Sequence, residues 1–234
     1  MPAQRLSLGR TDDMVIIRGG GSLDAAFVTD LGDVCAAVTE DMRVVVLNPD
    51  PQVWTGYSGP TDFGDLFAPL ADLPQPTLAV LSRATFGGGL ELALAADIRV
   101  APRDASIGLD SLGGDFPRAG GLQRLTRAVG RSRASQLLLL DEHIDAATAL
   151  DWGLINAAAD NPFEAAVAIA RSIAARGPIA TRYAKDAIRH GLDMPLAQAL
   201  HYETELTILL QDTNDRAEGV DAFVNKRTPA FSGT

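Results

Sequence analysis

The stretch Phe86-Gly87-Gly88-Gly89-Leu90-Glu91 tells more about the fold and the chemistry of this chain than any other. It follows the apolar run Thr77 to Ser82 and begins the helical pattern LELALAA. Three glycines between a strand and a helix allow a tight bend and let backbone N–H groups approach a ligand closely. The first N–H groups of a helix have no internal partner and lie at the positive end of the helix dipole. The turn is therefore suited to hold an anion, or an oxygen that is becoming one.

Other glycine-rich loops do not match this stretch. The dinucleotide fingerprint needs G-x-G-x-x-G with an acidic residue about twenty positions later, and the phosphate loop needs Gly-Lys-Ser/Thr after its glycines. Neither pattern is present. The glycines could also serve only to let a strand and a helix pack closely, with Glu91 as a favourable acid in the first helical turn. The residues of the turn alone leave both interpretations open.

Composition bounds the class of protein. A chain of 234 residues with 47% hydrophobic and 21% charged residues is typical of one globular domain, or one domain with a helical appendage. The net charge of -10 argues against nucleic acids and anionic membranes as general partners. Cys35 is the single cysteine, and His143, His190 and His201 lack zinc-ligand spacing, so we expect no disulfide and no metal site. We found neither a membrane-spanning run nor a signal peptide, and expect a cytoplasmic protein.

Short apolar runs alternate with helical patterns in the first half of the chain. The runs predict buried strands at Met14 to Ile17, Val44 to Leu47, Thr77 to Ser82 and Ile98 to Ala101. Helices are predicted at Leu23 to Thr39 and Glu91 to Ala96. Alternating strands and helices indicate an α/β fold with right-handed crossovers.

Beyond about Gly120 the pattern becomes almost entirely helical. Helices are predicted at Ala146 to Trp152, Phe163 to Ala175, Ile179 to His190 and Leu196 to Leu210. We therefore divide the chain into a core of residues 1–160 and a helical region of residues 161–234. The apolar faces of these helices could form a subunit interface or dock on their own domain, and Asn225 to Thr234 is expected to be an exposed extension.

Three blocks resemble the crotonase superfamily, the enoyl-CoA hydratase and isomerase group. The block PQPTLAVLSRATFGGGLELALAADIRVAP (residues 74–102) looks like the central motif of that family, and FPRAGGLQRLTRAVGRSRASQLLLLDEHIDAATALDWGLINAA (residues 116–158) looks like its next block. The end EGVDAFVNKRTPAF (residues 218–231) is similar to its closing helix and tail. The resemblance implies a spiral of ββα units followed by helices that assemble trimers, in some relatives paired into hexamers.

The resemblance also implies an oxyanion hole in which two backbone N–H groups hold the carbonyl oxygen of an acyl-CoA thioester. Its donors would be the N–H groups of Gly88 and Tyr57, and Gly56, Gly87 and Lys226 would contact the coenzyme A part of the substrate. Removing one such donor typically costs about 3 kcal/mol of transition-state stabilisation. VWTGYS (residues 53–58) departs from the family pattern, because Ser58 replaces an aspartate and Tyr57 a small residue. The Tyr57 ring is expected to narrow the acyl pocket, or else to point to solvent.

Two carboxylates are implied by the same resemblance, one to activate water and one to transfer the proton at the carbon alpha to the carbonyl. Glu91 matches the first hydratase glutamate. The second normally lies in a Pro-Glu pair, for which this chain has Leu109-Asp110 in a segment one residue shorter, so Asp110 is the candidate and Asp115 its substitute. Either aspartate could simply form a turn.

The most favoured function is the syn addition of water to a 2-enoyl-CoA, with no cofactor beyond the coenzyme A of the substrate. One alternative keeps the fold and changes the reaction to that of an isomerase, a decarboxylase or an acyl-CoA hydrolase. The other is a non-catalytic member that binds acyl-CoA or supports a partner enzyme, which the departures at Ser58 and Leu109-Asp110 suggest.

Overall fold

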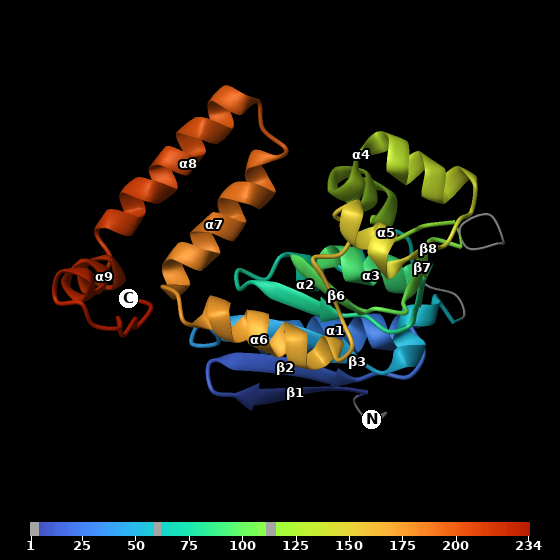
Figure 1. The fold of residues 1–234 in the computed structure, drawn as a ribbon, viewed down its shortest axis with the longest axis horizontal. Coiled ribbons are helices and arrows are strands. Elements are labelled where there is room, and N and C mark those ends of the chain that lie inside the picture. Colours follow the sequence, from blue (N-terminus) through green and yellow to red (C-terminus); the bar gives the residue numbers. More distant parts are fainter. Residues whose placement is uncertain (1–4, 59–61, 111–115) are drawn as a thin grey trace.

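The computed structural model describes residues 5–58, 62–110 and 116–234. A six-stranded sheet with the order β1-β2-β3-β4-β6-β9 forms the centre of the molecule (Figure 1). Its first pair is antiparallel and its other pairs are parallel. The strands are β1 (Leu6–Thr11), β2 (Met14–Gly19), β3 (Val44–Pro49), β4 (Thr77–Val80), β6 (Ile98–Pro102) and β9 (Ala157–Ala159). The α/β fold class predicted from the alternating pattern is confirmed.

Apolar side chains cover both faces of this sheet because neighbouring residues of a strand point to opposite sides. Val15, Ile17 and Leu47 face α1 (Ala25–Ala36) and the glycine-rich turn in the larger core. Met14, Ile16, Val44 and Val46 face α6 (Pro162–Ala174), which buries Ala166, Ala170 and Ala174 at four-residue spacing. The continuous apolar runs of the sequence thus correspond to strands buried on both sides.

A second, smaller sheet has the strand order β5-β7-β8. Its strands are β5 (Ala84–Phe86), β7 (Ser106–Gly108) and β8 (Ile144–Asp145). The helices beside it are α3 (Gly88–Ala95), α4 (Gly121–Leu139) and α5 (Ala146–Asp151) (Figure 1). A 3₁₀ helix, η1 (Pro51–Thr55), and the short α2 (Ala68–Ala71) connect β3 to β4. Strands β5, β7 and β8 were not predicted, because two- and three-residue strands carry too little periodicity to recognise. The six-residue edge strand β1 was not predicted because only Leu6 of its residues is buried, so it has no apolar run.

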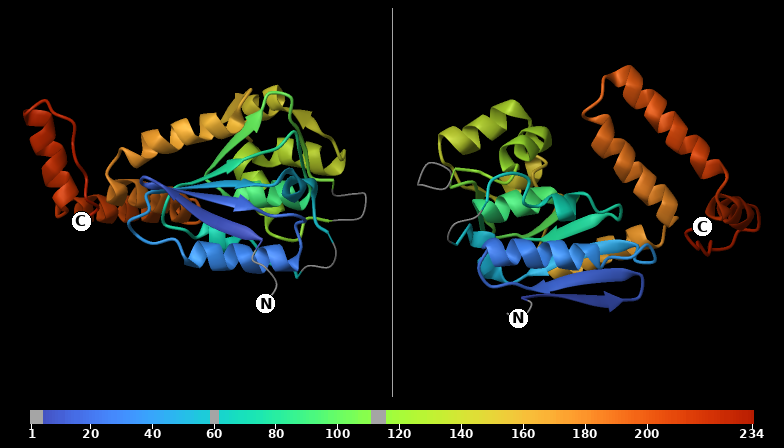
Figure 2. Two further views of the ribbon diagram at one scale, coloured as in Figure 1. Left: turned by 90° about the horizontal axis from the view of Figure 1, so that it is seen from below. Right: turned by 180° about the vertical axis from the view of Figure 1, so that it is seen from behind.

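Three helices project from the core, namely α7 (Pro178–Gly191), α8 (Leu196–Gln211) and α9 (Asn214–Val224) (Figures 1 and 2). The alanine stripe of α6, the first helix of the region 161–234, packs on the sheet, and the helices that project from the core begin with α7. None of the helices in the described residues is both long and apolar enough to cross a membrane.

Basic side chains along one face of α7 attach the projecting helices to the core. Arg182 donates to the carbonyl oxygen of Glu40, and Arg189 donates to that of Ala71 at 2.8 Å. Between them, Lys185 Nζ lies 2.8 Å from Asp97 Oδ2. Burial lowers the pKa of Lys185, an effect that the charge of Asp97 opposes. The attachment is therefore polar, unlike the apolar packing of α6.

Most residues of the C-terminal tail are exposed, as expected, but the tail folds back onto α9 and does not extend from the molecule. The backbone N–H groups of Ser232 and Gly233 donate to Asp215 Oδ1 at 2.7 and 3.1 Å. Arg227 pairs with Glu218 at 2.6 Å, and this bond together with the Ala230 N–H lowers the pKa of Glu218 to about 2. The buried carboxylate of Asp215 thus fixes the path of the tail by accepting its backbone N–H groups. The periodicity of the sequence does not reveal such a contact.

Candidate active site

The glycine-rich turn ends β5 and begins α3. Gly87, the N-cap of the helix, has φ 49° and ψ -124°, a conformation that favours glycine, and the N–H of Glu91 donates to its carbonyl oxygen at 3.1 Å. A Cβ atom on Gly87 would lie 3.7 Å from Gly56 Cα. Gly56 has φ 105° at the end of η1. The structure therefore brings Gly56 next to the predicted residues Gly87 and Gly88, which follow much later in the sequence.

Tyr57 lies beside this turn, where the backbone is held by a bridge to Leu23. In this bridge the Ser58 N–H donates to the Leu23 carbonyl oxygen at 2.8 Å. The bond therefore involves the N–H of Ser58 and not that of Tyr57, the predicted oxyanion-hole donor. The Tyr57 ring packs on Gly88, since a Cβ atom there would lie 2.6 Å from two of its carbons. The Arg118 guanidinium carbon is 4.9 Å from the centre of the same ring. The expectation that the ring narrows the pocket agrees with this position, and the alternative that it points to solvent is wrong.

Glu91 is fully buried at 0% exposure. Its Oε2 accepts the N–H groups of Ala119 and Gly121, both at 2.9 Å. Its Oε1 accepts the Arg118 N–H at 3.2 Å and the hydroxyl of Tyr57 at 3.1 Å. An ionised carboxylate has about four lone-pair sites, and these four donors match them. Glu91 thus joins the glycine turn to the segment before α4.

Asp110 lies at the end of the segment that follows β7. It has φ 47°, and its carboxylate is hydrogen bonded to His143 Nε2. The His143 ring stacks on Phe86 with a centroid distance of 4.3 Å, so the pair lies beside the residue before the glycine triplet. The proposed role of Asp110 as second acid and base stays a prediction. The substitute candidate, Asp115, lies outside the described residues.

Lys226 lies away from the glycine turn in this protomer, and two arginines of α4 are engaged in ion pairs. Lys226 follows α9, which projects from the core on the side opposite α3 and α4 (Figure 1). Arg124 pairs with Asp65 at 2.7 Å, and Arg127 pairs with Asp193 at 3.0 Å. A contact of Lys226 with coenzyme A therefore stays a prediction that needs a second subunit.

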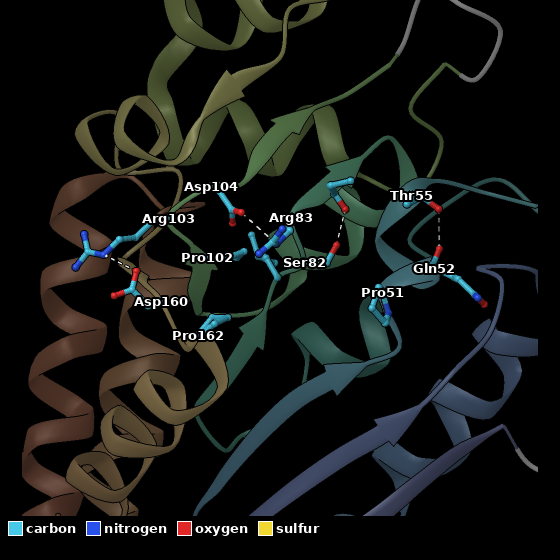
Figure 3. A pocket seen from close by; sticks show the side chains of 12 residues that line it. Pro51, Gln52, Thr55, Ser82, Arg83, Pro102, Arg103, Asp104, Asp160 and Pro162 are labelled. Carbon is cyan, nitrogen blue, oxygen red and sulfur yellow. Dashed lines mark hydrogen bonds and ion pairs between the residues drawn. The ribbon is translucent and has the colours of Figure 1, made fainter.

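A cavity of about 830 Å³ lies at the carboxyl ends of β4 and β6, next to η1 (Figure 3). Its rim carries two ion pairs, Arg83 with Asp104 at 3.1 Å and Arg103 with Asp160 at 3.3 Å. The residues that line it are Pro51, Gln52, Thr55, Leu81, Ser82, Arg83, Ala84, Pro102, Arg103, Asp104, Asp160 and Pro162. None of the predicted site residues is among them, so this cavity is separate from the glycine turn.

Sequence reasoning missed two features of the site. The backbone N–H groups that donate to Glu91 belong to Arg118, Ala119 and Gly121 in the stretch FPRAGG (residues 116–121). His143 was considered only as a possible metal ligand, and the structure pairs it with Asp110. The glycines of FPRAGG were a visible signal for the first feature, because a Cβ atom on Gly121 would lie 2.3 Å from Glu91 Cγ. No local pattern marked the second.

Comparisons with known proteins identify the family of this chain. The family model described as Enoyl-CoA hydratase/isomerase matches residues 57–234. The 2,3-dehydroadipyl-CoA hydratase of Escherichia coli is 35% identical over 213 residues, which cover 90% of this chain and 78% of that protein. A probable mitochondrial enoyl-CoA hydratase 2 of Arabidopsis thaliana is 40% identical over 171 residues. The aligned part covers 72% of this chain and only 57% of the Arabidopsis protein.

Solved structures show the same architecture. A crystal structure of an enoyl-CoA hydratase from Bacillus anthracis superposes with a TM-score of 0.91 and 31% identity, covering 99% of this chain and 100% of that one. A second structure, of an enoyl-CoA hydratase from Geobacillus kaustophilus, gives a TM-score of 0.90 with 30% identity over 100% of this chain and 98% of that one. The expected crotonase-like arrangement of core and C-terminal helices is confirmed.

Proposed function

Because the chain belongs to the enoyl-CoA hydratase/isomerase family, we propose that it adds water to the double bond of a 2-enoyl-CoA thioester. The observation that carries the proposal is the position of Glu91 within one helical turn of Gly88, with the backbone of Gly56, the residue before Tyr57, next to Gly87. Backbone N–H groups of Gly88 and Tyr57 would hold the thioester oxygen as negative charge develops on it. Glu91 would accept and return the proton that hydration moves.

Hydration of crotonyl-CoA tests the proposal. We expect the purified protein to reduce the absorbance of the conjugated thioester, and Glu91→Gln to lower kcat at least about 100-fold, since loss of an acid–base group typically costs that much. Glu164→Gln, an exposed acid in the first turn of α6, is the matched control and should leave kcat unchanged. Thermal unfolding of each variant separates lost chemistry from lost structure. If the wild type binds CoA esters but hydrates none of a broad panel, the proposed function is wrong.

One observation favours a second function, a member that binds acyl-CoA without hydrating it. Glu91 has no exposed surface and accepts four hydrogen bonds, so in this conformation no lone pair of its carboxylate faces a water molecule. Asp110 is engaged with His143. Tight binding of a saturated acyl-CoA together with absence of turnover would select this function.

We also propose that the protein assembles as a homotrimer or a hexamer through its projecting helices. Large apolar side chains of α7, α8 and α9 are exposed in the single chain, and burying them in a second copy would be favourable. They are Ile188, Leu196, Leu200, Ile208, Leu209, Val220, Phe223 and Val224. Light scattering should give three or six times the monomer mass, and Leu200→Glu should shift the protein towards the monomer. Leu150→Glu, an exposed leucine on α5, is the control. A monomeric wild type would contradict the proposal.

The acyl-CoA thioester is the proposed substrate, and no separate cofactor is part of the proposal. A cytoplasmic location remains our proposal from composition alone, since the names of some relatives include the word mitochondrial.

A further inference from the structure

We propose that the hydroxyl group of Tyr57 is the catalytic group that exchanges protons with the substrate, and that Glu91 acts behind it. The inference rests on the proposed hydration reaction and assigns to the Tyr57 side chain a role beyond its backbone N–H. It follows from three features of the site, namely the place of the ring, the hydrogen bonds of Glu91 and the pairing of Asp110.

The Tyr57 ring occupies the space between the oxyanion turn and Glu91. Ring atoms Cε2 and Cζ would both lie 2.6 Å from a Cβ atom on Gly88, so the end of the ring that carries the hydroxyl rests on the Gly88 backbone. The same hydroxyl donates to Glu91 Oε1 at 3.1 Å. A thioester held by the Gly88 N–H would therefore have Tyr57 Oη next to its reacting carbons. Glu91 lies one step further from the substrate.

Four groups of the described residues donate to Glu91, and among these only the hydroxyl of Tyr57 belongs to a side chain. The other three are backbone N–H groups of Arg118, Ala119 and Gly121, which are fixed by the path of the chain. A water molecule could reach the carboxylate directly only if Tyr57 moved away. If Tyr57 stays, its oxygen faces the substrate and its proton points to Glu91, which is the arrangement of a two-step proton relay.

The relay balances for the addition of water. The water oxygen bonds to C3 as its proton passes to Tyr57 Oη, while the proton of Tyr57 moves to Glu91 Oε1 and the C2=C3 electron pair becomes an enolate on the thioester oxygen. In the second step the proton of Glu91 returns to Tyr57 as Tyr57 protonates C2, and the carbonyl group re-forms. Both new bonds form on the face where Tyr57 lies, which gives syn addition. Tyr57 and Glu91 end in their starting states.

The relay does not need a second carboxylate. Asp110 is hydrogen bonded to His143, and its segment is one residue shorter than the family pattern. One relay that both accepts and returns the proton needs a single carboxylate.

Replacing Tyr57 by phenylalanine tests the relay, because the ring still packs on Gly88 while the hydroxyl is lost. We expect Tyr57→Phe to lower kcat at least about 100-fold, as for loss of a general acid–base group, with KM for crotonyl-CoA nearly unchanged. Exchange of the C2 protons of butyryl-CoA with deuterated water should slow in parallel, while calorimetry shows unchanged butyryl-CoA binding. Tyr202→Phe is the matched control, since the Tyr202 hydroxyl also donates to a carboxylate, Asp186 Oδ2 at 2.7 Å, away from the site.

The outcomes separate the relay from the proposed function. If the wild type hydrates enoyl-CoA and Tyr57→Phe has the same kcat or a higher one, the Tyr57 side chain only blocks access to Glu91 and must move aside. That result would overturn the relay, while the proposed hydratase function would stand. If the wild type hydrates no enoyl-CoA, the proposed function itself fails, and the relay fails with it.

Discussion

Gly89→Ala is expected to lower the free energy of unfolding by about 3 kcal/mol, because overpacking a fixed part of a core costs at least 1–3 kcal/mol. A Cβ atom at this position would lie 2.3, 2.4 and 2.5 Å from the carbonyl oxygen, carbonyl carbon and Cα of Trp54. Trp54 is 1% exposed, so its backbone has no free space into which it could move. The clash would displace η1 and, with it, Tyr57. Activity should fall as well, since a shift near 1 Å can cost about 100-fold in rate.

Urea unfolding monitored by tryptophan fluorescence measures this effect. Gly32→Ala is the matched control, because Gly32 lies inside α1 and a Cβ atom there has no neighbour within 4 Å. That control should be neutral or stabilise the protein by up to about 1 kcal/mol, the usual gain for Gly→Ala in a helix. Equal unfolding midpoints for the two variants would show that α3 does not pack on η1 as closely as the structure indicates.

Glu91→Leu is the second change with a large expected effect. Leucine keeps most of the volume but leaves the buried N–H groups of Ala119, Gly121 and Arg118 without their acceptor. Each buried donor that loses its partner costs about 1–3 kcal/mol, so we expect the variant to lose about 4 kcal/mol of stability. Calorimetric or urea unfolding measures the loss independently of any enzyme activity.

Glu91→Gln and Glu164→Leu complete this experiment. Glutamine keeps one acceptor oxygen, so its loss should be roughly half that of leucine. Glu164 occupies the first turn of α6 as Glu91 occupies that of α3, but it is exposed, and its replacement should cost less than about 1 kcal/mol. A Glu91→Leu variant as stable as the wild type would mean that the segment before α4 does not depend on this carboxylate.

The sequence predicted those features of the fold that depend on neighbouring residues. Four central strands and most helices follow from the local pattern of apolar residues. Their predicted ends differ from the observed ends by a few residues, as for the helix predicted at Leu23 to Thr39 and observed at Ala25–Ala36. The packing of α6 on the sheet could not be predicted from the sequence, because a stripe of alanines does not indicate which surface it will contact.

The residues of the glycine turn also include some that the sequence places and others that only the folded chain brings together. The spacing of Gly88 and Glu91 is a property of one helical turn, so the sequence alone placed the carboxylate beside the N-terminus of α3. The hydroxyl of Tyr57 reaches Glu91 across 34 residues and His143 reaches Asp110 across 33, and only the folded chain brings these groups together. Hydrogen bonds between distant segments depend on how the two sheets and α4 pack. Tertiary structure therefore decided the partners of each carboxylate, and sequence decided where the carboxylate at Glu91 lies.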